Sequence, residues 1–111
     1  MNWNERIIAA HTAVTHAVSH YKKLKSNRYF VWQEDGAEDL IAEGEHSERV
    51  MSGTTDLFTK AENDAWIREL ETSFDTYGIA WYLNSVQYEE DTGFIHYEWR
   101  WEVCANGQNA D

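Results

Sequence analysis

Two histidines in the first quarter of the chain have a spacing that could bind a metal ion. His16 and His20 stand four positions apart, so on a helix both imidazoles would lie on one face, where Zn²⁺ could bind. The residues between them are Ala-Val-Ser, which lack the glutamate of the HExxH motif of zinc proteases. His11 falls near the apolar stripe of the same predicted helix and is expected to be a hydrogen-bonded histidine at the core boundary. The pattern therefore favours a solvated helix face, and we predict no metal ligands.

Nucleophilic chemistry has little support in the sequence. Cys104, the single cysteine, follows the last predicted strand without a neighbouring base and is typical of a small apolar residue. The sequence contains no GxSxG, Walker or GxGxxG motif. Carboxylate pairs are common in an acidic chain, and catalysis would need one with a raised pKa in a partly apolar cleft. We therefore expect no catalytic residues, no cofactor and no enzymatic activity.

Carboxylates are concentrated between residues 34 and 48, where seven residues are acidic and none is Lys or Arg. This run predicts a mobile acidic loop. It is either a solvated loop or an electrostatic surface that repels DNA or steers a basic partner. The candidate residues of this loop are Asp35, Glu38, Asp39, Glu43, Glu45 and Glu48.

Composition excludes several functional classes. With 111 residues the chain has room for one folded domain, and 42% hydrophobic residues are enough for a core. The net charge of -11 argues against direct nucleic-acid binding and against binding to anionic membranes. The first six residues lack the basic and apolar regions of a secretory signal, so we expect synthesis and retention in the cytoplasm.

Hydrophobic periodicity divides the chain into two helical and four strand-like segments. Apolar residues recur every three or four positions from Trp3 to Leu24, which predicts a helix that ends near Ser26. Asn63 is a fair N-cap for a second helix that stops at Gly78. The predicted strands cover residues 28–33, 49–60, 79–88 and 94–103, and a turn at 89–93 joins the last two.

The order of these segments, α-β-β-α-β-β, predicts an α+β fold. The N-terminal helix and the second helix would pack on one face of a four-stranded antiparallel sheet. Strict alternation along residues 94–103 places aromatic and charged side chains on opposite faces of the last strand. We predict a single domain over residues 1–104 and a flexible C-terminal tail over residues 105–111.

Two segments of the chain resemble a known protein family. They are RVMSGTTDLFTKAEND at residues 49–64 and WIRELETSFDTYGIAWYLNSVQYEEDTGFIHYEWRWEV at residues 66–103. The combination of DLFTK at 56–60, a helix, and EEDTG at 89–93 carries the resemblance, which spans residues 47–103 in motif. In these features the chain resembles the tail-terminator or tail-completion (head-tail joining) proteins of long-tailed phages.

The resemblance implies a structural protein of the virion tail that is made in the host cytoplasm. Proteins of that family form a ring, commonly a hexamer, which caps the tail tube and later joins it to the head. The implied partners are further copies of the chain, the tail-tube protein and a head-completion or connector protein. Neither catalysis nor a cofactor is implied.

A closed ring needs two different, complementary patches on each subunit. The basic candidates for the assembly interface are Arg28, Arg49 and Arg100. An acidic channel through the ring would let DNA pass without binding. The acidic candidates for the assembly interface are Glu89, Glu90, Asp91, Glu98 and Glu102.

Three other functions fit the same sequence. An acidic protein could mimic DNA and inhibit a nucleic-acid-binding protein, which would need carboxylates spaced like phosphates over a folded face. The aromatic face of the sheet could instead line a ligand-binding or enzymatic pocket. A different ring protein of the head-tail connector or neck would share the size and the non-catalytic role.

Overall fold

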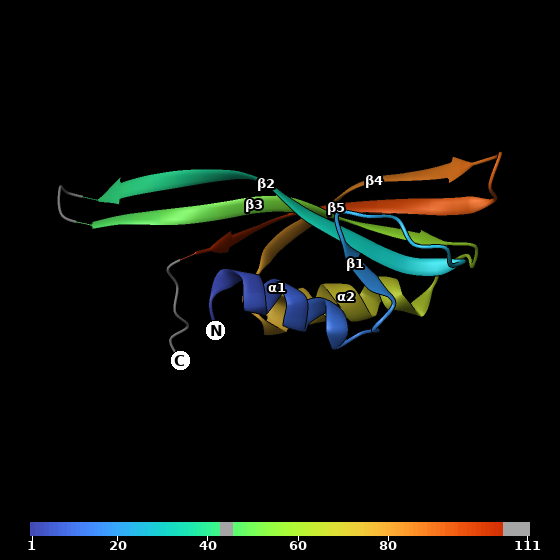
Figure 1. The fold of residues 1–111 in the computed structure, drawn as a ribbon, viewed down its shortest axis with the longest axis horizontal. Coiled ribbons are helices and arrows are strands. Elements are labelled where there is room, and N and C mark those ends of the chain that lie inside the picture. The colour runs from blue at the N-terminus through green and yellow to red at the C-terminus, as the bar shows by residue number, and fades with distance from the viewer. Residues whose placement is uncertain (43–45, 106–111) are drawn as a thin grey trace.

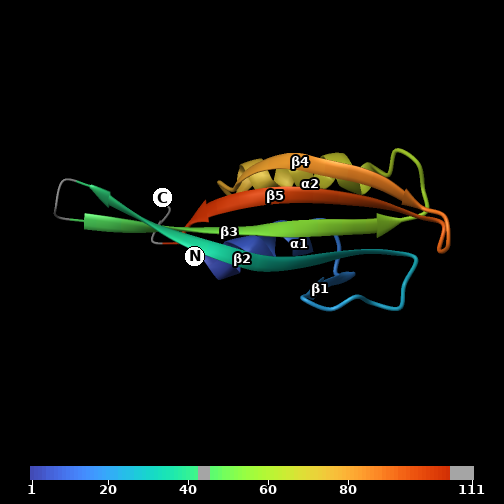
Figure 2. The same cartoon turned by 90° about the horizontal axis from the view of Figure 1, so that it is seen from above.

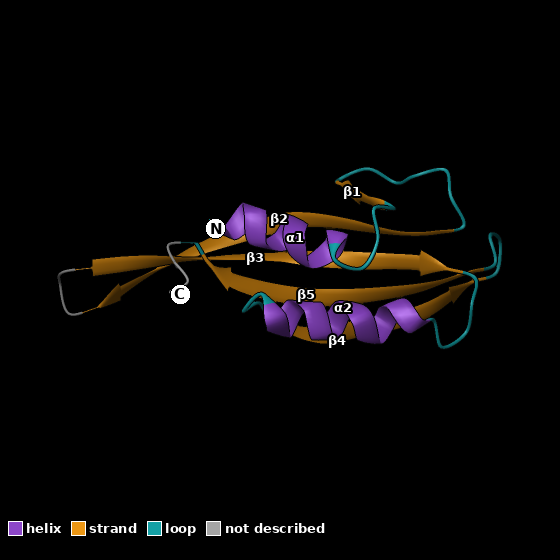
Figure 3. Ribbon diagram, turned by 90° about the horizontal axis from the view of Figure 1, so that it is seen from below, coloured by secondary structure: helices purple, strands orange, loops and turns teal. Residues whose placement is uncertain are grey.

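The computed structural model describes residues 1–42 and 46–105, and it places five strands and two helices in this part of the chain. The strands form one sheet in the order β1-β2-β3-β5-β4 (Figure 2). Both helices lie on the same face of the sheet (Figure 1), with α1 across β2 and β3 and α2 along β5 and β4 (Figure 3). The elements in chain order are α1 (Trp3–Thr12), β1 (Val18–His20), β2 (Arg28–Ala42), β3 (His46–Thr59), α2 (Ala65–Thr76), β4 (Ala80–Glu89) and β5 (Phe94–Cys104).

The predicted four-stranded antiparallel sheet is wrong, because the described chain has a fifth strand and the sheet is mixed. The element order is α-β-β-β-α-β-β. The additional strand, β1, pairs parallel with β2, and Val18 lies opposite Phe30. Both helices lie on one face of this mixed sheet, and the strand pairs among β2 to β5 are all antiparallel.

The first helix is less than half as long as predicted and ends at Thr12 instead of near Ser26. Its start is well defined, because the Asn2 side chain accepts from the Glu5 N–H at 2.8 Å and the Glu5 carboxylate accepts from the Asn2 N–H at 3.1 Å. The segment after Thr12 is rich in β-branched residues, including Val14 and Val18, which are stiff at χ1 and favour strands. Pairing with β2 therefore replaces further helical turns.

The acidic run is not a loop in the part that the structure describes. β2 continues through it to Ala42, and β3 begins at His46, with Ala42 and His46 opposite each other. Since β5 pairs with β3 only from Val50 onward, the distal part of this hairpin is a two-stranded ribbon that projects beyond the rest of the sheet (Figure 1). The backbone N–H and C=O groups of the two strands bond to each other whatever side chains the strands carry. Exposed carboxylates are therefore compatible with strand pairing.

The core lies between the helix-covered face of the sheet and the two helices. Alternation along β5 is confirmed, since Trp99, Trp101 and Val103 are buried on that face. Gly53 of β3 permits the Trp101 ring to approach closely, because an added Cβ would lie 2.5 Å from the ring. The other fully buried members of this core include Ile7, Ala10, Phe30, Leu57, Leu70 and Phe74.

A chain of buried hydrogen bonds crosses this core. His11 Nδ1 donates to the Ile7 carbonyl oxygen at 2.7 Å, and its Nε2 accepts from the Thr55 hydroxyl at 2.9 Å. Thr55 Oγ1 in turn accepts from Trp101 Nε1 at 3.0 Å. Burial lowers the pKa of His11 to about 4, although the bond to the Ile7 carbonyl acts in the opposite direction. His11 is hydrogen-bonded as predicted, but it lies fully in the core rather than at its boundary.

The second helix and the final hairpin follow the prediction closely. The helix begins one residue later than predicted, because Asp64 rather than Asn63 is the N-cap and its side chain accepts from the Trp66 N–H at 2.9 Å. Gly78, at a φ of +70°, follows the last helical turn as predicted. Gly93, at a φ of +79°, closes the turn between β4 and β5. Residues 106–111 of the predicted tail lie outside the described residues.

Candidate assembly interface

The face of the sheet opposite the helices carries some of the charged candidates, among them Glu98 and Arg100 of β5. On β5 this face holds the alternate residues His96, Glu98 and Arg100, and on β3 it holds Asp56 opposite Glu98. No helix of the described residues covers this face (Figure 1). The charged side chains on this face therefore have no described helix packed over them.

His96 lies at the centre of an acidic cluster on this face. Its Nε2 is 2.8 Å from Asp56 Oδ1, and its Nδ1 is 3.4 Å from Glu89 Oε2. The ring stacks on Phe58 with a centroid distance of 4.3 Å. The hydrogen bond to Asp56 raises the pKa of His96 against the opposing effect of burial, and the charges of Asp56, Glu89 and Glu98 add to the rise. Sequence alternation places His96 on this face, but it does not reveal the three carboxylates around it.

Arg100 and Glu98, both predicted interface residues, have partners within the chain. Arg100 Nη1 donates to Asp35 Oδ2 at 2.7 Å, which links β5 to the proximal part of the acidic run. Asn84 Nδ2 donates to Glu98 Oε1 at 2.8 Å, which links β4 to β5. These contacts use part of the hydrogen-bonding capacity of both side chains within their own chain, which leaves less of it for a neighbouring subunit.

The turn after β4 presents two exposed carboxylates. Glu90 and Asp91 are exposed at its tip, whereas Glu89 is half-buried beside His96. The Gly93 N–H donates to the Glu89 carbonyl at 2.8 Å, which closes the turn. The structure thus divides the predicted acidic triplet into one residue with a contact in its own chain and two that point outward at the turn.

The remaining candidates are spread over the long hairpin. Asp35 and Glu38 are exposed on β2, and Arg49 is exposed on β3. Asp39 and Glu48 belong to the paired strands, with Asp39 opposite Arg49, but their side chains are outside the described part of the structure. Glu43 and Glu45 lie outside the described residues. The structure therefore does not gather the acidic candidates into one compact patch.

Arg28, the third basic candidate, has a structural role. Its guanidinium donates from Nε to Asp64 Oδ2 at 2.8 Å, forms a second bond to the other carboxylate oxygen, and stacks over Trp66. Burial raises the pKa of Asp64, but its hydrogen bonds from Arg28, the Trp66 N–H and Thr59 outweigh this effect and lower the pKa overall. Arg28 therefore connects the start of β2 to the start of α2.

The outer edge of β4 is a surface feature that the sequence analysis missed. β4 pairs with β5 on one side and has no strand partner on the other side within the described chain. Its period-two pattern predicted a strand but could not show that this strand lies at an edge. Large apolar side chains are exposed along it: Tyr82, Leu83, Val86 and Tyr88, between 40% and 65%.

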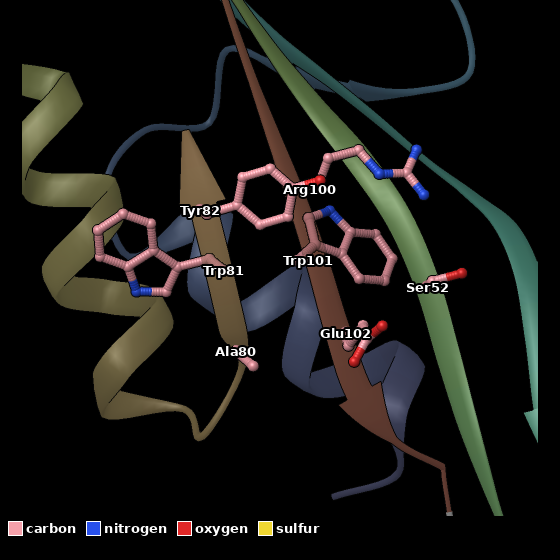
Figure 4. A pocket seen from close by; sticks show the side chains of 7 residues that line it. All are labelled: Ser52, Ala80, Trp81, Tyr82, Arg100, Trp101 and Glu102. Atoms are coloured by element: carbon pink, nitrogen blue, oxygen red, sulfur yellow. The ribbon is translucent and has the colours of Figure 1, made fainter. Parts of the chain in front are cut away.

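A shallow pocket of about 300 Å³ adjoins the same strand. Figure 4 shows Tyr82 of β4 and Arg100 of β5 beside it. No three His, Cys, Asp or Glu side chains among the described residues come together as a metal site. The helical spacing considered for His16 and His20 does not exist, because α1 ends at Thr12 and His20 lies in β1, 2.8 Å from Glu34.

Comparisons with known proteins identify a likeness of fold. No known protein family matches the sequence, and no curated protein matches it. A chain in the structure of the virion of a native gene transfer agent (GTA) particle matches 93% of this chain and 90% of its own length. The TM-score is 0.51 and the sequence identity is 10%. The two chains therefore share a fold over nearly their whole lengths. No described helix is long and apolar enough to cross a membrane.

Proposed function

We propose that this protein is a structural component of a phage-like virion. The observation that carries the proposal is the likeness of fold, over 93% of the chain, to a chain of a gene transfer agent virion. The family resemblance of residues 47–103 points in the same direction. Assembly with other virion proteins follows from this role, and catalysis is not part of it.

Within that class, we propose a tail terminator that forms a ring, caps the tail tube and joins the tail to the head. Its partners are further copies of this chain, the tail-tube protein and a head-completion protein. The shape of the subunit supports this role, since an edge strand with exposed apolar side chains and a projecting hairpin are both available to neighbours. Another ring protein of the head-tail connector or neck remains the alternative within the same class.

The turn after β4 is the proposed contact with the tube or the head. Glu90 and Asp91 are exposed at its tip, so reversing both charges should leave the fold unchanged and impair assembly. Glu62→Lys with Glu69→Lys makes the same charge change at exposed positions near and on α2 and is the matched control. Circular dichroism should show equal folding for both double variants.

The proposal is tested by light scattering and negative-stain microscopy of the purified protein, alone and with the tail-tube protein. We expect the wild type to form rings, either free or at the ends of tubes of uniform length. The variant with Glu90 and Asp91 reversed, the tip variant, should be impaired in this assembly, and the control should assemble like the wild type. A protein that stays monomeric and does not bind tubes would contradict the proposal and favour the alternative of an acidic inhibitor that mimics DNA. Normal tube capping by the tip variant would exclude the turn as the contact.

A further inference from the structure

β4 has the properties of a strand that pairs with another chain. It is ten residues long, and its outer backbone groups have no strand partner within the described chain. Such an edge is a template for pairing, because each exposed N–H and C=O can continue the ladder. The exposed side chains of Leu83, Val86 and Tyr88 would add apolar contact area to that pairing.

The usual protection of a free edge is almost absent from β4. Natural edge strands carry charged side chains, especially lysine, or prolines, which discourage pairing. From Ala80 to Tyr88 this strand has no charged residue and no proline, in a chain in which 26% of residues are charged. It retains a single irregularity, at Asn84, where the register with β5 shifts. The sequence of β4 therefore favours pairing over protection.

The opposite edge of the sheet provides a matching surface. β1 covers β2 only from Phe30 to Trp32, so within the described chain the outer side of β2 has no strand partner over Gln33–Ala42. This stretch is as long as β4. It carries the carboxylates of Glu34, Asp35 and Glu38, and two copies of such an edge would repel each other. β4, which is uncharged from Ala80 to Tyr88, has no such conflict with it.

Strand direction also favours this combination. β2 is antiparallel to β3, β3 to β5, and β5 to β4, so β2 and β4 run in opposite directions within one sheet. When a second copy continues the sheet in the same orientation, β4 of one copy meets β2 of the next in an antiparallel arrangement. Antiparallel pairing is the more stable kind per residue, and the contact between two different edges is of the head-to-tail type that can close a ring.

We infer that β4 of one copy pairs antiparallel with the outer edge of β2, Gln33–Ala42, of a second copy of this chain. The inference deepens the proposed function and rests on it, because it assigns the subunit contact of the ring. Hydrogen bonds between the two backbones supply most of the contact, and the apolar side chains of β4 extend it on the helix-covered face.

Chemical crosslinking of paired cysteine variants tests the contact. Gln87→Cys places a thiol on β4 and Glu38→Cys places one on the outer half of β2, both at exposed positions on the face opposite the helices. Each is made in a Cys104→Ser background, so that every chain has one thiol. A short bis-maleimide should crosslink an equimolar mixture of the two variants into dimers, whereas neither variant alone should give more than background.

The possible results separate this inference from the proposed function. Crosslinks that form in the mixture but not in either variant by itself would support the inference. Efficient crosslinking of Gln87→Cys by itself would indicate a two-fold contact between β4 strands and would overturn it. Rings that give no crosslink in the mixture would overturn the contact and leave the proposed function intact. Crosslinked open chains without rings would support the contact and contradict the tail terminator, and a strict monomer would overturn both.

A single charge on the edge provides an independent test. Val86→Glu places a carboxylate among the exposed apolar side chains of β4, where it would meet the acidic edge of β2 and repel it. Thr72→Glu makes the same charge change at an exposed position of α2 and is the control. The β4 variant should remain monomeric at concentrations at which the control assembles, with at least a tenfold weaker association. Equal assembly of both variants would contradict the inference.

Discussion

Acidification should destabilise this protein through one buried imidazole, that of His11. In the folded chain burial lowers its pKa to about 4, whereas an exposed histidine has a pKa of 6.5. Between these two values the unfolded chain binds a proton that the folded chain does not. Stability is therefore fully present above the unfolded pKa and is lost as the pH falls towards the folded pKa.

The magnitude follows from the two pKa values. Between about pH 7 and about pH 5 the loss in free energy of unfolding is about 2 kcal/mol, and it approaches about 3 kcal/mol near pH 4. His96 acts in the opposite sense, because its raised pKa contributes stability below the ordinary histidine pKa that is lost as the pH rises through its folded value. The His11 contribution must therefore be isolated by difference.

The assay is urea unfolding at a series of pH values for the wild type and for His11→Gln. Glutamine does not titrate in this range, and all other groups are common to both chains, so the difference between the two pH slopes belongs to His11. Should the variant fold poorly, NMR titration of the wild-type imidazoles measures the same quantity directly. Equal pH slopes, or a His11 resonance that titrates near 6.5, would refute the reasoning.

Two further substitutions probe the positions that the fold constrains most. Gly53→Ala would bring a Cβ to 2.5 Å from the Trp101 ring, so we expect it to cost about 3 kcal/mol in urea unfolding, whereas Gly36→Ala meets only a flexible side chain and should cost much less. Asp64→Ala removes the cap of α2 and leaves the Arg28 guanidinium without its carboxylate, which should lower the free energy of unfolding by about 2 kcal/mol. Equal effects of the two glycine variants, or no loss at Asp64, would contradict these assignments.

The parts of the fold that were predicted from sequence are those set by local pattern. α2 has apolar residues at helical spacing and ends beside Gly78, and both features appear in the structure. The final hairpin has strict alternation on β5 and a glycine at the position of positive φ. In these segments the residues that determine the structure are close in sequence, so their spacing was sufficient.

The parts that were mispredicted depend on distant partners. Val18 fits a helical stripe as well as it fits a strand, and only its pairing with Phe30 selects the strand. The acidic residues from 34 to 42 resemble a loop in composition, but the opposite strand supplies their backbone hydrogen bonds. Composition describes side chains and says little about a ladder formed by the backbone.

The same distinction bears on how this protein could assemble. Sequence analysis identified interface candidates by their charge, yet Arg100 and Glu98 already have partners within their own chain. β4 has no charged residue from Ala80 to Tyr88 and its outer edge has no strand partner within the described chain, so a search based on charge did not identify it. For a chain with a net charge of -11, bringing copies together costs electrostatic repulsion, and an uncharged edge is where that cost is smallest. Backbone pairing between the outer edges of β4 and β2 is therefore the subunit contact that we propose, in place of a set of ionic contacts.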